Sequence, residues 1–168
     1  IATLLAPTFM TPMAVIARLV SVAMSVGLAY AVGGIAHEIA RVAFEREEAR
    51  VRETIERWAA PMAALLVSVG APLSYYAHVT NLDIPACCWM MVALREFVRA
   101  LARNEPHRLF RTAAFAVAAI TTKDQAYAAF GLTLPVGLFT WWRTLGPEQR
   151  KPFLRVVLKV ALLGGVSL

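Results

Sequence analysis

Two short segments of the chain gather polar side chains whose types could take part in chemistry. These are Tyr76, His78, Asn81 and Asp83 in the first segment and Lys123, Asp124 and Gln125 in the second. A lysine ammonium is a compact point charge that suits a phosphate group. A carboxylate can accept hydrogen bonds from hydroxyl groups or coordinate a metal ion. The residue types therefore suggest a site that combines one cation with carboxylates.

The elements that must position these residues are unusually apolar. Of the 168 residues, 59% are hydrophobic and only 17% are charged, and the mean hydropathy is +0.60. Soluble domains contain roughly 45–50% apolar residues even when glycine is counted. The composition therefore argues against a soluble enzyme domain, against intrinsic disorder and against a nucleic-acid-binding tail.

The positive charge is concentrated rather than scattered. The formal net charge is +6, and three windows, residues 41–57, 95–111 and 143–159, hold five Lys or Arg each. Only Arg18 and Lys123 lie elsewhere. Because cytoplasmic loops of membrane proteins retain Lys and Arg, the three windows are expected to face the cytoplasm. The two nearly uncharged turns, His78 to Asp83 and Lys123 to Gln125, are then expected to face outward.

Between the windows run charge-free stretches, of which Leu19 to Ala36 and Trp58 to Leu82 approach the roughly 20 helical residues that cross a 30 Å hydrocarbon core. The expected fold is all-α, a polytopic transmembrane bundle of about six membrane helices. These are Pro12 to about Ala40, Trp58 to His78, Ile84 to Leu101, Pro106 to Thr122, Gln125 to Trp142, and Pro152 to the end. Because the chain begins without Met and stops in an apolar run, we expect residues 1–168 to be a single transmembrane domain truncated at both ends.

Three other features have simple interpretations. The first window alternates glutamates with arginines, which suits a solvated helix that lies along the interface or extends a neighbouring one. The adjacent Cys87 and Cys88 cannot easily bridge each other and are expected to be small packing residues. His37 and Glu38 resemble the start of a zinc-protease motif, but Arg41 stands where the second histidine is needed, so no metalloprotease is implied.

Lys123 is expected to be slightly recessed from the outer surface. The fourth predicted helix has only about 17 residues, some 25 Å of rise against a 30 Å core. Ionisable groups at that depth usually line a cavity or a substrate path. The alternative is that Lys123 extends to the headgroups and pairs with Asp124 without any function.

The other candidate residues have similar alternatives. Asp83 precedes a proline at a helix start, where a carboxylate can cap orphan backbone N–H groups. His78 and the neighbouring Tyr76 suit an interfacial aromatic belt as well as a ligand role. Arg18 lies inside the first predicted span and requires either a nearby helix start or an anionic partner.

Three sequence segments together resemble the GT-C superfamily of membrane glycosyltransferases. They are Ala17-Arg18-Leu19-Val20-Ser21, Tyr76-Ala77-His78-Val79-Thr80-Asn81-Leu82-Asp83-Ile84-Pro85 and Ala118-Ala119-Ile120-Thr121-Thr122-Lys123-Asp124. The resemblance is greatest to family 39, which includes protein O-mannosyltransferases and the bacterial aminoarabinose transferase of lipid A. It extends from Arg18 to about Pro135.

The resemblance implies a function and a set of site residues. Such enzymes transfer a sugar from a polyprenyl-phosphate carrier to an acceptor on the non-cytoplasmic face. Asp83 matches a supporting acidic residue and Lys123 matches the lysine that faces the carrier phosphate. The secondary candidates are His78, Asn81, Asp124, Gln125, Tyr76 and Arg18.

The match also leaves some features open. Asp124 and Gln125 depart from the Gly-Pro that follows the lysine in the aminoarabinose type. The leading catalytic carboxylate would precede Ile1, and a divalent metal is neither required nor excluded. The sugar and the acceptor, whether protein, lipid or glycan, are not specified.

Two other classes stay open. In a multi-pass transporter or lipid-translocating protein, Asp83, Lys123 and Asp124 would belong to a substrate or proton path, but no inverted repeat is visible. A purely structural membrane subunit would leave the recessed charges unexplained. The Ala- and Arg-rich composition favours a bacterial inner (plasma) membrane, with the site on its periplasmic face and no nucleic-acid partner.

Overall fold

The computed structural model describes residues 2–70, 83–123 and 126–166, and the side chains of 12–70, 83–123 and 126–163. In these ranges the chain forms six α-helices and one 3-10 turn, and no strand. The elements are α1 (Ala2–Ala43), α2 (Ala49–Ser68), α4 (Asp83–Arg103), η1 (Pro106–Arg108), α5 (Leu109–Thr122), α6 (Ala126–Thr144) and α7 (Pro147–Val166). The prediction of an all-α fold is confirmed.

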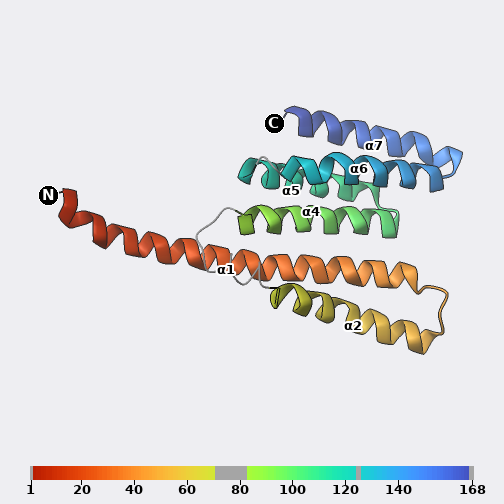
Figure 1. Ribbon diagram of the computed structural model, residues 1–168. Helices are drawn as coiled ribbons and strands as arrows, with labels where there is room; N and C mark the ends of the chain where they lie inside the picture. The colour runs from red at the N-terminus through yellow and green to blue at the C-terminus, as the bar shows by residue number, and fades with distance from the viewer. Residues whose placement is uncertain (1, 71–82, 124–125, 167–168) are drawn as a thin grey trace.

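Successive helices alternate in direction, so three of the connections lie at one end of the bundle (Figure 1). These connections join α1 to α2, α4 to α5 and α6 to α7, and each falls within one of the three basic windows. We call this end the basic end. The first residue of α4 and the last residue of α5 lie at the opposite end, as the two predicted outward turns require.

The prediction of one helix from Trp58 to His78 is wrong at its first boundary, and α2 ends before the second; residues 71–78 of the predicted range lie outside the described residues. Helix α2 begins at Ala49, inside the Glu- and Arg-rich window, and ends at Ser68. Its apolar part therefore rises only about 16 Å. Gly70 and the proline at position 72 follow in the sequence, and both disfavour continuation of a helix. Of the two alternatives for the first window, the structure has the extension of a neighbouring helix, since residues 49–57 form the first turns of α2.

The predicted start of the first helix at Pro12 is also wrong, because α1 begins at Ala2, and it ends at Ala43 rather than about Ala40. The remaining boundaries differ less. Helices α4 and α6 match their predicted ranges within two residues, and α5 with η1 covers the fourth range. Helix α7 begins at Pro147, five residues before the predicted Pro152. Proline suits the first turn of a helix because its missing N–H would be unpaired there. The backbone N–H of Gln149 donates to Gly146 O at 3.0 Å and closes the first turn.

Only α1, among the described helices, is long and apolar enough by composition to cross a membrane. The candidate segment is Pro12–Ala43. Helices α4 and α7 carry several charged residues, and α5 has 14 residues. The six-span membrane bundle therefore stays a prediction.

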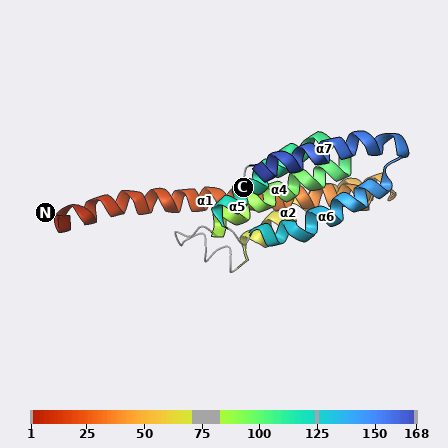
Figure 2. The same ribbon diagram turned by 90° about the horizontal axis from the view of Figure 1, so that it is seen from above.

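Helices α1 and α4 pack in parallel with a constant register. A side chain built on Gly27 would meet Cys88 Sγ, and one on Gly34 would meet Arg95. Farther along, Glu38 is paired with Arg99. Each pair is 61 residues apart in the chain, so every level of α1 can be matched to a level of α4. The N-terminal part of α1 extends beyond all other helices in both views (Figures 1 and 2).

Two apolar clusters join α4 to the C-terminal helices. The cluster at the basic end consists of Phe97, Ala100, Leu109, Trp141, Leu145 and Phe153. The second cluster consists mainly of alanines from α4, α5 and α6, with Phe130. Asn104 follows α4 with a φ of 53°, a left-handed conformation common after a helix end. Its Oδ1 accepts a hydrogen bond from Trp141 Nε1 at 3.0 Å, which ties this turn to α6.

Cys87 and Cys88 are both free thiols. Cys88 is buried against Gly27 at the α1–α4 contact. This confirms the prediction of a packing role for Cys88.

The packing of α6 on α4 can be tested with two glycines of the same helix. A Cβ on Gly137 would lie 2.5 Å from the buried ring of Phe97, whereas one on Gly131 would meet nothing within 4 Å. Both Gly→Ala changes gain the same helix propensity. We expect Gly137→Ala to destabilise the chain by about 1–3 kcal/mol through overpacking, and Gly131→Ala to leave it unchanged or more stable. Thermal unfolding in one detergent measures both, and equal midpoints would contradict this packing.

Candidate functional site

Asp83 and Lys123 form an ion pair between the two ends that the sequence predicted to meet. Lys123 Nζ donates to Asp83 Oδ1. Asp83 is the first residue of α4, and Lys123 directly follows α5. Their side chains are 26% and 39% exposed, respectively, so the pair is neither fully buried nor fully solvated. The cation and the carboxylate therefore lie together at the end opposite the basic windows.

Local backbone geometry fixes where Lys123 leaves its helix. Its backbone N–H donates to Ala119 O at 3.0 Å as the last helical bond, and its φ and ψ of −155° and 120° are extended. Its carbonyl accepts from the N–H of Ala126 at 3.0 Å. Helix α6 therefore starts within three residues, and the short turn keeps Lys123 against the beginning of α4.

Arg18 lies close to the level of this pair. In the constant α1–α4 register, Arg18 corresponds to position 79, four residues before Asp83, or about 6 Å along the axis. Its side chain is exposed. It has no ion pair within the described ranges. Arg18 is thus a second cation near this end, on the helix that extends beyond it.

The remaining predicted site residues lie outside the described residues. They are Tyr76, His78 and Asn81 in the segment 71–82, and Asp124 and Gln125 in the second turn. The partner of Lys123 that the structure describes is Asp83. The described ranges contain no group of three His, Cys, Asp or Glu side chains that could bind a metal ion.

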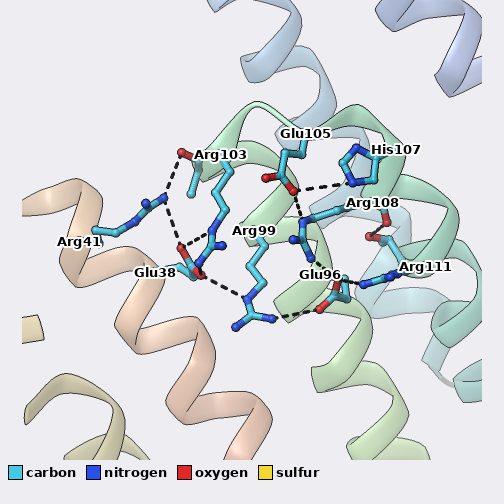
Figure 3. Close-up of polar contacts among 11 residues, drawn as sticks. Glu38, Arg41, Glu96, Arg99, Arg103, Glu105, His107, Arg108 and Arg111 are labelled. Atoms are coloured by element: carbon cyan, nitrogen blue, oxygen red, sulfur yellow. Dashed lines mark hydrogen bonds and ion pairs between the residues drawn. The ribbon is translucent and has the colours of Figure 1, made fainter. Parts of the chain in front are cut away.

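A second polar cluster, which sequence reasoning missed, occupies the basic end (Figure 3). Its centre is Glu38 of α1, whose side chain is fully buried. Arg103 Nη2 lies 2.5 Å from Glu38 Oε1, and Arg99 Nε donates to the same oxygen at 3.2 Å. Arg41 Nη2 lies 3.4 Å from Oε2. One buried carboxylate is thus shared by three guanidinium groups from two helices.

Glu96 and Glu105 extend this cluster toward η1 and α5. Glu96 Oε2 accepts a hydrogen bond from Arg108 Nη1 at 3.1 Å, and Arg111 lies 4.0 Å away. Arg108 also donates to Glu105, and this contact holds the pKa of the Glu105 carboxyl below its usual range. Across the cluster five arginines face three glutamates, which leaves a positive excess.

A sequence signal for this cluster does exist. Arg95, Arg99 and Arg103 recur every four residues and therefore share one face of a helix. Inside a bundle such a stripe requires carboxylates from a neighbouring helix. Glu38, placed directly after a long charge-free stretch, is the carboxylate that meets Arg99 and Arg103.

Comparison with family models, with curated proteins and with solved structures gives no match to this chain.

The buried carboxylate is expected to dominate the stability of the basic end. Glu38→Gln leaves three guanidinium groups without their shared partner, so we expect a loss of about 3 kcal/mol, near the lower bound for removing one member of a buried ion pair. Glu47, exposed in the loop after α1, provides the control Glu47→Gln, with a change within about 0.5 kcal/mol. Unfolding midpoints in detergent measure both. Similar midpoints would show that the cluster does not hold α1 to α4.

Proposed function

We propose that this chain is part of a membrane-embedded glycosyltransferase that takes its sugar from a polyprenyl-phosphate donor on the non-cytoplasmic face. The observation that carries the proposal is the ion pair between Asp83 and Lys123 at the end opposite the basic windows. The motif resemblance assigns roles to these same two residues.

The dimensions of the bundle favour a membrane. Helix α4 has 21 residues and is about 31 Å long, close to the roughly 30 Å hydrocarbon core. Its first residue belongs to the Asp83–Lys123 pair and its last to the Glu38 cluster, so charged groups gather near its two ends. Between these levels large apolar side chains are exposed on several helices, among them Leu66, Leu132 and Leu158.

The charge of Lys123 suits the leaving group of this reaction. In the transfer, the bond from the anomeric carbon of the sugar to the phosphate oxygen breaks, and the phosphate leaves with the electron pair. An acceptor hydroxyl supplies the new bond and loses its proton to a base that we do not place in this chain. A positioned ammonium would stabilise the charge that develops on the phosphate.

Asp83 would hold the ammonium in place before the donor binds. Because the two side chains are partly exposed, a phosphate can approach the lysine without first opening a sealed core. Asp83 then remains near the reacting centre, where its carboxylate can accept a hydrogen bond from a sugar hydroxyl. The apolar carrier would lie along the exposed side chains below.

The alternative is that the pair only fastens α4 to α5. A charge reversal separates the two roles, because Asp83→Lys combined with Lys123→Asp retains an ion pair but moves the cation to the other helix. A structural role predicts that this double variant keeps its function. A phosphate-binding role predicts that it does not.

The membrane orientation can be tested by labelling with a membrane-impermeant maleimide in intact cells. Thr121 and Glu47 are both exposed and lie near opposite ends of the bundle. We expect Thr121→Cys to be labelled from outside and Glu47→Cys only after the cells are permeabilised. The parent chain, with Cys87 and Cys88, gives the background. Labelling of both positions from the same side would contradict the proposed topology.

Donor binding can be measured with undecaprenyl phosphate, the carrier without its sugar. In the full-length protein we expect undecaprenyl phosphate to raise the unfolding midpoint and Lys123→Met to abolish that rise. The same variant should lower the rate of sugar transfer by about 100-fold or more, the range for removing one electrostatic contact in a transition state. Lys151→Met, at the basic end, is the control. Wild-type transfer by Lys123→Met, or by the charge-reversed double variant, would refute the assigned role.

A further inference from the structure

Arg95 is a cation in the interior of α4 that the described carboxylates leave without an ion pair. It lies eight residues before the end of α4, or about 12 Å from that end along the axis. None of the described carboxylates lies within 4.0 Å of the Arg95 guanidinium, the distance of an ion pair. Its Nε atom is buried and has no hydrogen-bond partner. A guanidinium at such a depth in a membrane is costly unless an anion or water reaches it.

This guanidinium borders a groove of about 340 Å³ between α1, α2 and α4. Arg95 and Arg99 line it together with Tyr30 and His37. The Cζ atom of Arg95 lies 4.4 Å from the centroid of the Tyr30 ring, so the aromatic face supports the cation from one side. Arg99 already binds Glu38 and Glu96, whereas Arg95 has no such partner.

Two adjacent glycines shape the α1 wall of the groove. A Cβ on Gly34 would lie 2.2 Å from Arg95 Nε, and one on Gly33 would lie 2.9 Å from the carbonyl oxygen of Ala60. The bare backbone at Gly34 therefore allows Arg95 to lie across α1. The remaining walls, Ala60, Pro61 and Ala64, are apolar. The groove thus combines the guanidinium of Arg95, and that of Arg99, which already pairs with Glu38 and Glu96, with a mostly apolar lining.

We propose that this groove binds the phosphate of an anionic membrane lipid, with Arg95 as the principal contact and the acyl chains along the apolar wall. Guanidinium groups match phosphate oxygens in a bidentate geometry. A lipid is favoured over a small soluble anion because the lining is mostly apolar and because, in the proposed topology, the groove lies toward the cytoplasmic leaflet. The inference rests on the membrane placement proposed above but not on sugar transfer.

The test measures unfolding midpoints of the purified full chain in detergent with added dioleoylphosphatidylglycerol, dioleoylphosphatidylcholine or inorganic phosphate. We expect a rise of several degrees with phosphatidylglycerol alone. Arg95→Gln should remove more than half of that rise. Arg155→Gln, an exposed arginine of α7, should retain it.

A second variant covers the case in which Arg95→Gln fails to fold. Gly34→Ala keeps the charge of Arg95 but displaces its side chain from the groove, so it should also lose most of the rise. Three outcomes would overturn the lipid site. The unfolding midpoint could rise equally with both lipids, it could rise equally with inorganic phosphate, or both Arg95→Gln and Gly34→Ala could keep the full rise with phosphatidylglycerol.

The two proposed phosphate contacts can fail separately. Lys123→Met should lose the response to undecaprenyl phosphate and keep the response to phosphatidylglycerol, and Arg95→Gln should show the reverse. If the chain is extracted from cells without detergent, the membrane placement itself fails, and the lipid site fails with it.

Discussion

The buried carboxylate of Glu38 fixes how α1 and α4 lie against each other. It accepts contacts from Arg99 and Arg103 of α4 and from Arg41 of its own helix. An unpaired charge at this position would be strongly destabilising, so a slip of α1 along α4 is disfavoured. The same register then sets the levels of Gly27, Gly34 and Arg18 relative to α4.

That register connects the two ends of the molecule. With the C-terminal half of α4 held by arginine contacts, its first residue, Asp83, lies about 31 Å away at the other end. The short α5 returns from the basic end and places Lys123 at the same level. The position of the ion pair is thus a consequence of helix lengths and of the packing of α4 on its neighbours. The close approach at Gly34 likewise determines where Arg95 lies.

The charged groups of this chain fall into two kinds. At the basic end the carboxylates are saturated by arginines from several helices, which suits a structural role. Asp83 and Lys123 form an ion pair whose side chains are partly exposed, and Arg95 has a buried nitrogen without a hydrogen bond. Lys123 and Arg95 therefore retain the capacity to bind an anion, whereas the arginines around Glu38 are already occupied by carboxylates.

The sequence alone determined the helical class, the alternation of the chain and the meeting of Asp83 with Lys123 at one end of the bundle. Apolar stretches between basic windows set the helices, and a hairpin of two helices must bring its ends together, which predicted that Asp83 and Lys123 share one end. Sequence reasoning misplaced both ends of α2, because the charge-free run from Trp58 hides a helix start inside the Glu- and Arg-rich window, and Gly70 with the proline at position 72 marks the stop only weakly. It also could not show the partners of Glu38, the register of α1 on α4 or the groove at Arg95. These depend on side chains 61 residues apart, and only the packing of whole helices decides which of them meet.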